Sequence, residues 1–317
     1  MIDPASENGR ALRARLGPEL YAKRMQRERD KLTKFLHQGR GIFRLERILP
    51  FDALLAGILK FIGLQSRMRR DFLDVRLEER EWFFSNLPAA FEGFRLLHLT
   101  DLHCDLDPEL IDRVIDLVRD APHDVALLTG DYRNGMEGDH ACATRGMARL
   151  REALTQECWA ILGNHDPLEM ALDLERVGLP VLLNEVAEIR RGGDSLWIAG
   201  VDDPHYYQTH DLADTRRKAP EDAFVILLSH SPETYVEADA LGFALQLSGH
   251  THGGQICLPG GRHLVVPCKV PRRFIAGAWS HGTMQGYTSR GTGACGIAAR
   301  WNCPPEITLH TLRRGKV

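Results

Sequence analysis

The sequence lacks the cysteine pattern of a zinc ribbon or of a disulfide-stapled protein. Its 317 residues include seven cysteines, an odd number, and none of them forms a Cys-x-x-Cys pair. No apolar stretch follows the first basic residues, as it would in a secretory signal. The densest apolar run covers residues 53–64 and falls short of the roughly 20 residues that a membrane-spanning helix needs. We therefore expect no signal peptide, no spanning helix, and a reducing compartment.

Net charge is small, only −3, but it is unevenly distributed. Residues 1–70 carry 16 Lys and Arg against 7 Asp and Glu, a balance of +9, whereas residues 71–317 carry 24 against 36, a balance of −12. Such asymmetry predicts that the N-terminal segment meets a polyanion, either a membrane surface or a nucleic acid. The basic residues do not show the regular interleaving with aromatic residues of a base-stacking platform, so nucleic acid is the weaker alternative.

The N-terminal segment reads as two parts. Residues 1–45 are rich in charged residues and predict a solvated helix or a mobile arm. Basic residues flank the apolar run on both sides, so residues 44–70 predict an interfacial helix on an anionic bilayer. A helix packed on the catalytic domain, or on a dimer partner, is the alternative. We favour the first and expect a cytoplasmic protein at the inner face of the cell membrane, with an extension over 1–85 and a catalytic domain over 86–317.

From residue 94 onward, short apolar runs alternate with amphipathic segments. The segments at 108–119 and 143–154 have helical spacing and separate the first three apolar runs. This alternation predicts a parallel sheet with helices on its faces. The predicted strands are residues 94–100, 124–130, 158–163, 181–183, 195–199, 223–229 and 243–248.

Polar side chains follow five of these strands. They read Asp-Leu-His at 101–103, Gly-Asp at 130–131, Gly-Asn-His-Asp at 163–166, His at 230 and Gly-His-Thr-His at 249–252. Because ligands of open α/β sheets bind at the carboxyl ends of the strands, we expect these side chains to converge. Carboxylate, imidazole and amide groups suit borderline divalent metals. Their number exceeds the four ligands that one tetrahedral ion needs, which favours two ions sharing a bridging carboxylate.

Local geometry supports this expectation. A glycine precedes three of the polar segments, where the backbone must approach the ions closely. In Asp101-x-His103 and His250-x-His252, an extended backbone would point both side chains of each pair the same way. One such motif alone would mean little, but all five in order make an accidental match improbable.

The five motifs resemble the signature of the calcineurin-like metallophosphoesterase superfamily, which is D-x-H, GD, GNH[D/E], H and GHxH. The resemblance covers residues 94–312 and implies a four-layer α/β/β/α sandwich. The stretches GHTHGGQI (249–256), YTSRGTG (287–293) and RWNCPPEITLHTL (300–312) resemble a bacterial, membrane-associated branch. That branch includes pyrophosphatases acting on UDP-2,3-diacylglucosamine in lipid A synthesis. Many of its members carry a membrane anchor or export signal, where this chain has a basic amphipathic extension.

The resemblance also implies a set of metal ligands. Metal one would be held by Asp101, His103, Asp131 and His252, and metal two by Asp131, Asn164, His230 and His250. The nucleophile would be a metal-bound hydroxide, since coordination lowers the pKa of water towards about 7. We expect two divalent ions, with manganese first. Iron, zinc and cobalt stay open as alternatives, because ligand type does not separate these metals.

Further residues have expected roles near the ions. His165 should face the substrate, stabilising the transition state or protonating the leaving group. Asp166 should orient the imidazole of His165 or cap a helix that begins at Pro167. Arg290 is a candidate contact to a substrate phosphate, with a structural salt bridge as the alternative. His205 is expected at the rim.

These features predict a metal-dependent phosphohydrolase acting on a phosphoester or pyrophosphate of a membrane-associated substrate. Release of UMP from UDP-2,3-diacylglucosamine is its sharpest form. One alternative is a soluble phosphodiesterase acting on cyclic nucleotides or nucleic acid. Another is a non-catalytic scaffold with the same fold, which the loss of a metal ligand would mark. Every predicted ligand is present.

Overall fold

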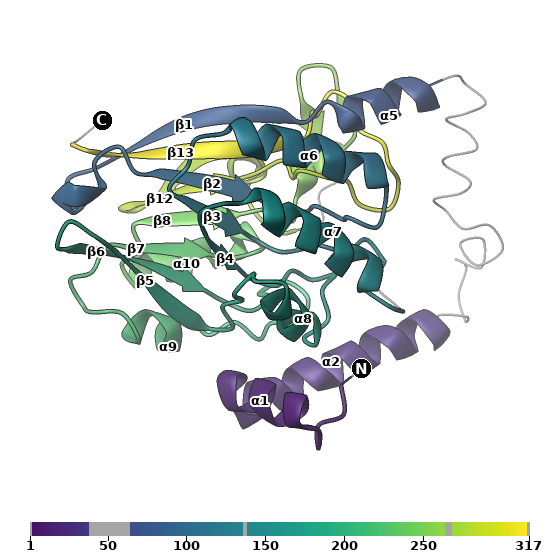
Figure 1. Cartoon of the computed structure of the whole chain (residues 1–317), viewed down its shortest axis with the longest axis horizontal. Coiled ribbons are helices and arrows are strands. Elements are labelled where there is room, and N and C mark those ends of the chain that lie inside the picture. Colours follow the sequence, from purple (N-terminus) through teal and green to yellow (C-terminus); the bar gives the residue numbers. More distant parts are fainter. Residues whose placement is uncertain (1, 38–63, 136–137, 264–267, 316–317) are drawn as a thin grey trace.

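Two β-sheets lie face to face in the computed structural model, which describes residues 2–37, 64–135, 138–263 and 268–315 (Figure 1). The first sheet has the strand order β1 (Arg76–Phe84), β13 (Glu306–Arg314), β2 (Arg95–Leu99), β3 (Val125–Leu128) and β4 (Glu157–Ala160). The second has the order β11 (Gly277–His281), β12 (Met284–Thr288), β8 (Leu245–Ser248), β7 (Val225–Leu228), β6 (Asp194–Gly200) and β5 (Glu185–Arg191). A short hairpin joins β9 (Cys257–Leu258) to β10 (Arg262–His263).

Helices cover the outer face of each sheet, which gives the four-layer α/β/β/α sandwich. The first sheet is covered by α6 (Pro108–Asp120), α7 (Ala141–Ala153) and α8 (Met170–Arg176), and the second by α9 (Leu212–Arg217) and α10 (Tyr235–Ala240). Single 3₁₀ turns are η1 (Ala89–Phe91), η2 (Pro232–Thr234), η3 (His252–Gly254) and η4 (Arg272–Phe274). The strands predicted around the motifs are present, and the parallel pairings β2–β3–β4 and β6–β7–β8 are as expected.

The sequence prediction missed the edges of the sheets. Strand β1 pairs in parallel with β13, so residues 76–84 belong to the first sheet. The predicted boundary at 85/86 would separate β1 from its sheet and is wrong for that reason. Strand β5, at the edge of the second sheet, is also unpredicted, and it runs antiparallel to β6. Edge strands are half exposed and carry charged residues, so no continuous apolar run marks them.

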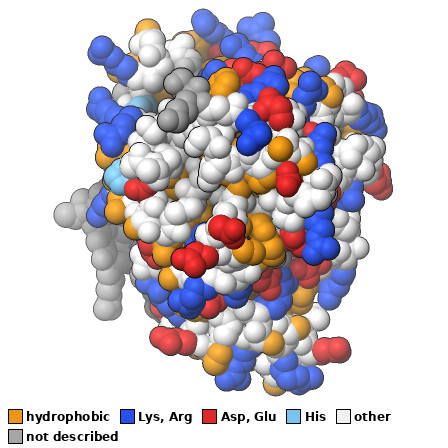
Figure 2. All heavy atoms as spheres, turned by 90° about the vertical axis from the view of Figure 1, so that its left-hand side faces the viewer, with side chains coloured by type: hydrophobic (Ala, Val, Ile, Leu, Met, Phe, Trp, Pro, Cys, Tyr) orange, Lys and Arg blue, Asp and Glu red, His pale blue; other side chains and the backbone are white. Residues whose placement is uncertain are grey.

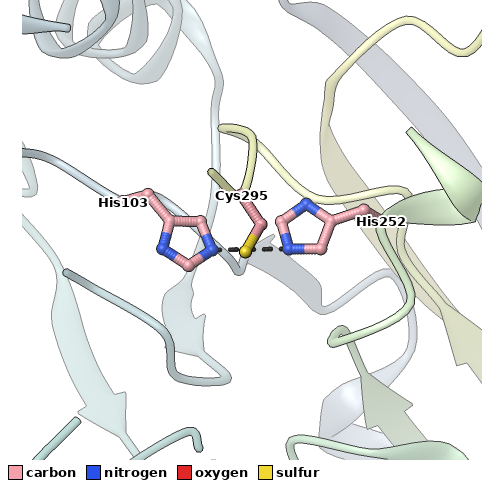
Figure 3. Close-up of side chains that lie close together, drawn as sticks. All are labelled: His103, His252 and Cys295. Carbon is pink, nitrogen blue, oxygen red and sulfur yellow. Dashed lines mark hydrogen bonds between the residues drawn. The ribbon is translucent and has the colours of Figure 1, made fainter. Parts of the chain in front are cut away.

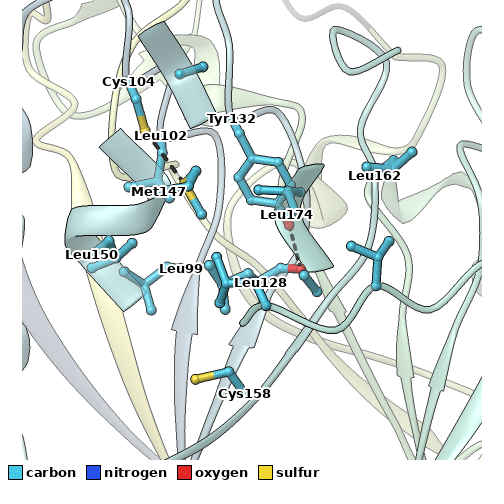
Figure 4. Packing of buried hydrophobic residues seen from close by; sticks show 14 of the residues in the cluster. Leu99, Leu102, Cys104, Leu128, Tyr132, Met147, Leu150, Cys158, Leu162 and Leu174 are labelled. Carbon is cyan, nitrogen blue, oxygen red and sulfur yellow. Dashed lines mark hydrogen bonds between the residues drawn. The ribbon is translucent and has the colours of Figure 1, made fainter. Parts of the chain in front are cut away.

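Alternating side chains of the central strands pack into two separate hydrophobic cores. In β2, Leu97 and Leu99 point to the core under the outer helices, whereas Leu96 points between the sheets. Figure 4 shows the first core, where Leu99, Leu128, Met147 and their neighbours interdigitate. Burying each such side chain contributes about 1.5–3 kcal/mol. The cores fix the positions of the strand ends, and therefore the points at which the loops after the strands begin.

A pair of buried histidines lies between the sheets. The His98 and His310 rings are 5.6 Å apart, and Nε1 of Trp82 donates a hydrogen bond of 2.9 Å to Nδ1 of His310. Burial lowers the pKa of His98 to about 3 and lowers the pKa of His310 well below its usual range. Both rings are therefore neutral in the folded protein, although an exposed histidine in the unfolded chain titrates near pH 6.5.

The N-terminal extension is not a solvated arm where the structure describes it. Helices α1 (Glu7–Leu16) and α2 (Pro18–His37) form a hairpin that packs under α8 and its flanking loops (Figure 1). Leu12 is fully buried, and Tyr21 and Met25 are almost so. The helical character predicted for 1–45 is confirmed for the described residues, but the prediction that this segment is solvated or mobile is wrong for residues 2–30, whose apolar positions were too few to mark a buried face.

The basic residues of the extension find anionic partners within the chain itself. Arg15 forms ion pairs with Glu175 and Glu185, at 2.7 and 2.6 Å. Arg24 is completely buried and lies 2.7 Å from Asp202. These two arginines are therefore neutralised within the chain, and a polyanionic partner for the extension stays a prediction. Figure 2 shows that, on the face it presents, acidic and basic side chains are interspersed.

The predicted membrane segment lies mostly outside the described residues. The structure describes its last part, residues 64–70, most of which lies in helix α5 (Gln65–Leu73). There, Arg67 lies over the Trp301 ring at 4.4 Å, and Arg69 forms an ion pair with Asp107 at 2.8 Å. Among the residues that the structure describes, no helix combines the length and the apolar content needed to cross a bilayer.

Candidate metal centre

The seven predicted metal ligands come together at the carboxyl ends of the central strands. The loops after β2, β3, β4, β7 and β8 each supply one or two of them. All seven side chains are buried, with at most 7% of any residue exposed. Residues separated by up to 151 positions thus share one site because the two sheets present their carboxyl ends to the same edge.

One group of ligands centres on the carboxylate of Asp131. Nε2 of His230 lies 3.3 Å from Oδ2 of Asp131 and 3.0 Å from Oδ1 of Asn164. His250 completes this group, and its buried Nε2 has no hydrogen-bond partner among the described residues. The ring of His230 is fixed from behind by Nδ1, which lies 2.7 Å from the carbonyl oxygen of Thr129.

The second group adjoins the first through the same carboxylate. Asp101, His103 and Asp131 place their donor atoms within 4.8 Å of one another. Nε2 of His252 lies 3.3 Å from Nε2 of His103 and 3.4 Å from Oδ1 of Asp101. Two groups that share Asp131 are the arrangement in which one carboxylate can bridge two ions.

The chemistry of these contacts fits cations. Nδ1 of His103 lies 2.7 Å from the carbonyl oxygen of Arg133, so this nitrogen carries the proton and Nε2 presents a lone pair to the site. Nδ1 of His230 is held in the same way by the carbonyl oxygen of Thr129, so a bound cation would meet Nε2 beside the oxygens of Asp131 and Asn164. Ligand atoms about 2.1 Å from a common ion would be separated by about 3.0–3.4 Å, which matches the distances of 3.0–3.4 Å that Nε2 of His230 and Nε2 of His252 make to neighbouring ligand atoms.

Electrostatics favour the same conclusion. Burial raises the pKa of the Asp101 carboxyl group to about 6. Burial would also raise the pKa of Asp131, but neighbouring imidazoles hold it well below its usual range. Burial would lower the pKa of His230, yet the Asp131 carboxylate raises it to about 10. Burial is the main reason for the lowered pKa values of His103, His250 and His252. Divalent cations would balance this crowded set of donors without protons.

The backbone of the motifs is not extended, as the sequence analysis expected, but left-handed. Asp101 and His103 have φ values of 53° and 43°, and His250 and His252 have values of 69° and 50°. L-residues adopt this region at a cost of about 1–2 kcal/mol each. The side chains of each pair therefore converge because the chain coils sharply after its strand, and the cores beneath the loops maintain that strained conformation.

Two glycines allow the backbone to approach the ligands. A Cβ atom at Gly163 would lie 2.2 Å from Oδ1 of Asp131, and one at Gly249 would lie 2.1 Å from Oγ1 of Thr100. Both distances are far below any allowed contact. The close approach predicted for these glycines is confirmed.

Comparison with known proteins identifies the family. Residues 94–254, half of the chain, match the model of the calcineurin-like phosphoesterase family. This protein belongs to that family. A Bacillus subtilis protein described as uncharacterized metallophosphoesterase YkoQ is 28% identical over 273 residues, covering 83% of this chain and all of its own length. Phosphodiesterase YaeI of Escherichia coli is also 28% identical, over 74% of this chain and 86% of its own.

Among solved structures, the NAD nucleotidase NadN of Haemophilus influenzae aligns with a TM-score of 0.43 at 15% identity. The alignment covers 64% of this chain, which spans about half, 51%, of that protein. Family membership makes this protein a metal-dependent phosphoester hydrolase. The family uses two divalent metal ions, and the ligand groups around Asp131 fit them.

In this phosphoesterase, Asp166 has a different task from the one predicted. Its carboxylate accepts hydrogen bonds from the backbone N–H groups of Asp131, Tyr132 and Gly163, at 2.7, 3.0 and 2.9 Å. It therefore ties the loop after β3 to the loop after β4. Helix α8 begins only at Met170, so Asp166 is not its cap either.

The imidazole of His165 is held by another residue. Its Nδ1 lies 2.8 Å from the carbonyl oxygen of Asn134, and its backbone N–H donates to Oδ1 of Asp131 at 2.8 Å. Nε2 of His165 faces the ligand cluster, 3.9 Å from Oδ2 of Asp131. This position suits a residue that touches substrate rather than metal, and that role stays a prediction.

Two weaker candidates are also placed. Arg290 forms ion pairs with Glu306 and with Glu78, the latter at 2.8 Å, so the structure favours the salt-bridge alternative over a phosphate contact. The ring of His205 lies 4.2 Å from that of His250, and its Nδ1 lies 2.7 Å from a carboxylate oxygen of Glu233. His205 therefore lies beside the metal ligands, close to its predicted position at the rim.

Two residues near the ligands are not marked by any pattern in the sequence. Arg300 is fully buried and donates hydrogen bonds to the carbonyl oxygens of Gly293 and His252, at 2.7 and 3.2 Å. Cys295 places its sulfur 3.7 Å from Nε2 of His165. Neither stands at a strand end, and no spacing in the sequence marks them.

Proposed function

We propose that this phosphoesterase cleaves a phosphodiester or pyrophosphate bond in an amphiphilic, membrane-borne substrate. UDP-2,3-diacylglucosamine, hydrolysed with release of UMP, is the most specific form of the proposal. The observation that carries it is an apolar rim beside a site rich in metal ligands. A phosphate would bind at the ligands while an acyl chain occupies the rim.

The rim is a small cluster separate from the three large cores. Its members are Leu64, Met68, Ile256, Ile297, Ala299 and Trp301, of which all but Met68 and Ala299 are only partly buried. Gln255, adjacent to Ile256, hydrogen-bonds the backbone of Cys295, whose sulfur lies 3.7 Å from Nε2 of His165. Gln255 and Cys295 thus connect the apolar cluster at Ile256 to His165 at the site.

The chain's own groups suit the chemistry. Bound at Asp131 and its neighbours, divalent ions would activate water and neutralise charge on the phosphoryl oxygens. The Asn134 carbonyl holds the His165 ring by Nδ1, so Nε2 faces the ligand cluster and would protonate a leaving-group oxygen bound there. Asp166 keeps the two ligand loops in register through its three backbone hydrogen bonds. Water activation, leaving-group protonation and loop positioning are then assigned to separate groups.

A substrate panel on metal-reconstituted, full-length protein tests the proposal. UDP-2,3-diacylglucosamine in mixed micelles is compared with bis(p-nitrophenyl) phosphate and with cyclic AMP. We expect kcat/KM for the lipid to exceed that for the soluble diesters at least about tenfold, equivalent to about 1.4 kcal/mol of binding to the rim. The Asp131→Asn variant, stripped of metal, serves as the inactive control.

A rim variant sharpens the result. Trp301→Ala should lose more activity on the lipid than on the soluble diester, because only the lipid reaches the rim. Good turnover of soluble diesters together with inactivity on the lipid would reject the amphiphilic substrate and favour a soluble phosphodiesterase.

Contact with an anionic membrane through residues 44–70 is part of the same proposal. Co-sedimentation of the full-length protein with vesicles containing phosphatidylglycerol, at low and high salt, tests it. Binding that weakens with salt supports an electrostatic contact. Absence of binding at low salt would contradict it.

A further inference from the structure

The sulfur of Cys295 faces the ligands of metal one. It lies with Nε2 of His103 and Nε2 of His252 in a group whose three atoms are all within 4.8 Å of one another (Figure 3). The two nitrogens are themselves only 3.3 Å apart. The sulfur therefore faces two imidazole nitrogens that already converge on one point, one of them with its lone pair fixed by the hydrogen bond to the Arg133 carbonyl.

The backbone around Cys295 is tightly fixed in this position. The side chain of Gln255 accepts a hydrogen bond from the N–H of Cys295 at 2.8 Å and donates one to its carbonyl oxygen at 3.0 Å. The next N–H, of Gly296, donates to Oδ1 of Asn134 at 2.7 Å. Three side-chain hydrogen bonds on two successive residues hold the sulfur in place, so the loop does not have to become ordered when a ligand binds.

Two other thiols near the site are used differently. The sulfur of Cys303 donates to the carbonyl oxygen of His252 at 3.3 Å, and that of Cys257 donates to the carbonyl oxygen of Gly253 at 3.3 Å. Both are buried behind the backbone of the ligand loop. Cys295 is only partly buried and faces imidazole nitrogens instead.

We propose that Cys295 supplies a thiolate ligand to the cation held by His103 and His252. The inference rests on the metal centre of the proposed function but not on the choice of substrate. On binding, the thiol would release its proton to solvent as the sulfur–metal bond forms. A thiolate among imidazole and carboxylate ligands favours zinc, iron or cobalt over manganese, which prefers oxygen donors. The metal preference of this chain would then differ from the expectation that places manganese first.

Cobalt substitution tests the bond directly. Full-length protein stripped of metal and loaded with Co²⁺ should show a sulfur-to-cobalt charge-transfer band in the near ultraviolet. The band should vanish in Cys295→Ser and persist in Cys142→Ser, a control at an exposed cysteine on α7. Zinc affinity of Cys295→Ser, measured by competition with a chelator, should fall at least about tenfold, while manganese affinity changes less.

A second measurement uses only wild-type protein, so it can test the proposal even if Cys295→Ser fails to fold. Alkylation of wild-type protein by iodoacetamide, mapped by peptide mass, should modify Cys295 at least about tenfold more slowly with Zn²⁺ than without, whereas Cys142 reacts equally in both. Equal alkylation of Cys295 with and without zinc, or a charge-transfer band that persists in Cys295→Ser, overturns the proposal. Neither readout depends on turnover, so a wrong substrate would leave both unaffected.

Discussion

Replacing Arg24 by methionine should destabilise the protein by about 3–5 kcal/mol, the usual cost of breaking a buried ion pair by removing one partner. Arg24 is fully buried and donates to Oδ1 of Asp202 at 2.7 Å, to the carbonyl oxygen of Asp166 at 2.6 Å and to Glu28 at 3.1 Å. Its guanidinium also lies over the Tyr207 ring, 3.4 Å from the centroid.

The penalty arises chiefly from the partner left behind. Asp202 is also fully buried, and burial raises the pKa of its carboxyl group even with Arg24 present to lower it. Without the cation, Asp202 must either take up a proton or remain charged in an apolar environment. Adding Asp202→Asn to the Arg24→Met variant should therefore recover part of the lost stability, because the amide has no charge to bury.

Thermal unfolding followed by circular dichroism measures the effect. At about 2 °C per kcal/mol for a chain of this size, Arg24→Met should lower Tm by about 6–10 °C. Arg29→Gln, which removes an exposed positive charge from the same helix, should shift Tm by less than about 1 °C. Equal Tm values for the two variants would refute the account of Arg24, as would a double variant less stable than Arg24→Met.

Three other predictions follow from the described contacts. Burial lowers the folded-state pKa of His98 to about 3, so the stability due to its neutral form is complete above pH 6.5 and is lost as pH falls towards 3. Denaturant titrations between pH 6 and 4 should therefore show that the free energy of unfolding falls less steeply in His98→Gln than in the wild type, by about 1.4 kcal/mol per pH unit. An unchanged slope would contradict a neutral buried ring. Gly163→Ala should lower metal content, measured by elemental analysis, because its Cβ would lie 2.2 Å from the Asp131 carboxylate; full occupancy would show that the loop can move aside. His165→Ala should retain metal but lose about 10²–10⁴-fold in kcat, and an unchanged rate would remove His165 from the mechanism.

The ligands and the parallel strands that position them were predictable from sequence because both depend on local features, whereas the four layers followed only from the family resemblance. An apolar run followed at once by Asp, Asn or His marks the carboxyl end of a buried strand, and parallel strands bring those ends together. Identifying the strands therefore located Asp101, Asp131 and His230 at one edge without knowledge of any contact between them.

Contacts between distant, individually unremarkable residues were not predictable. The hydrogen bond from Arg24 to Asp166 spans 142 positions, and the Gln255 clamp on Cys295 spans 40. An arginine in a charged helix looks the same in sequence whether it faces solvent or a buried carboxylate. The role of Asp166 was mistaken for the same reason, since its three partners are backbone amides, which every residue possesses.

By itself, the sequence determined the central strands that precede the motifs, the chemical nature of the ligands and the edge of the sheets at which they meet, because periodicity and strand-end position are encoded in neighbouring residues. Only the tertiary structure decided that the basic N-terminal helices turn inward to the catalytic domain, that the ligand loops coil in a left-handed conformation, and that a thiol joins the imidazoles. Each of these depends on which surfaces come into contact once the cores have formed, and burial is a property of the whole fold.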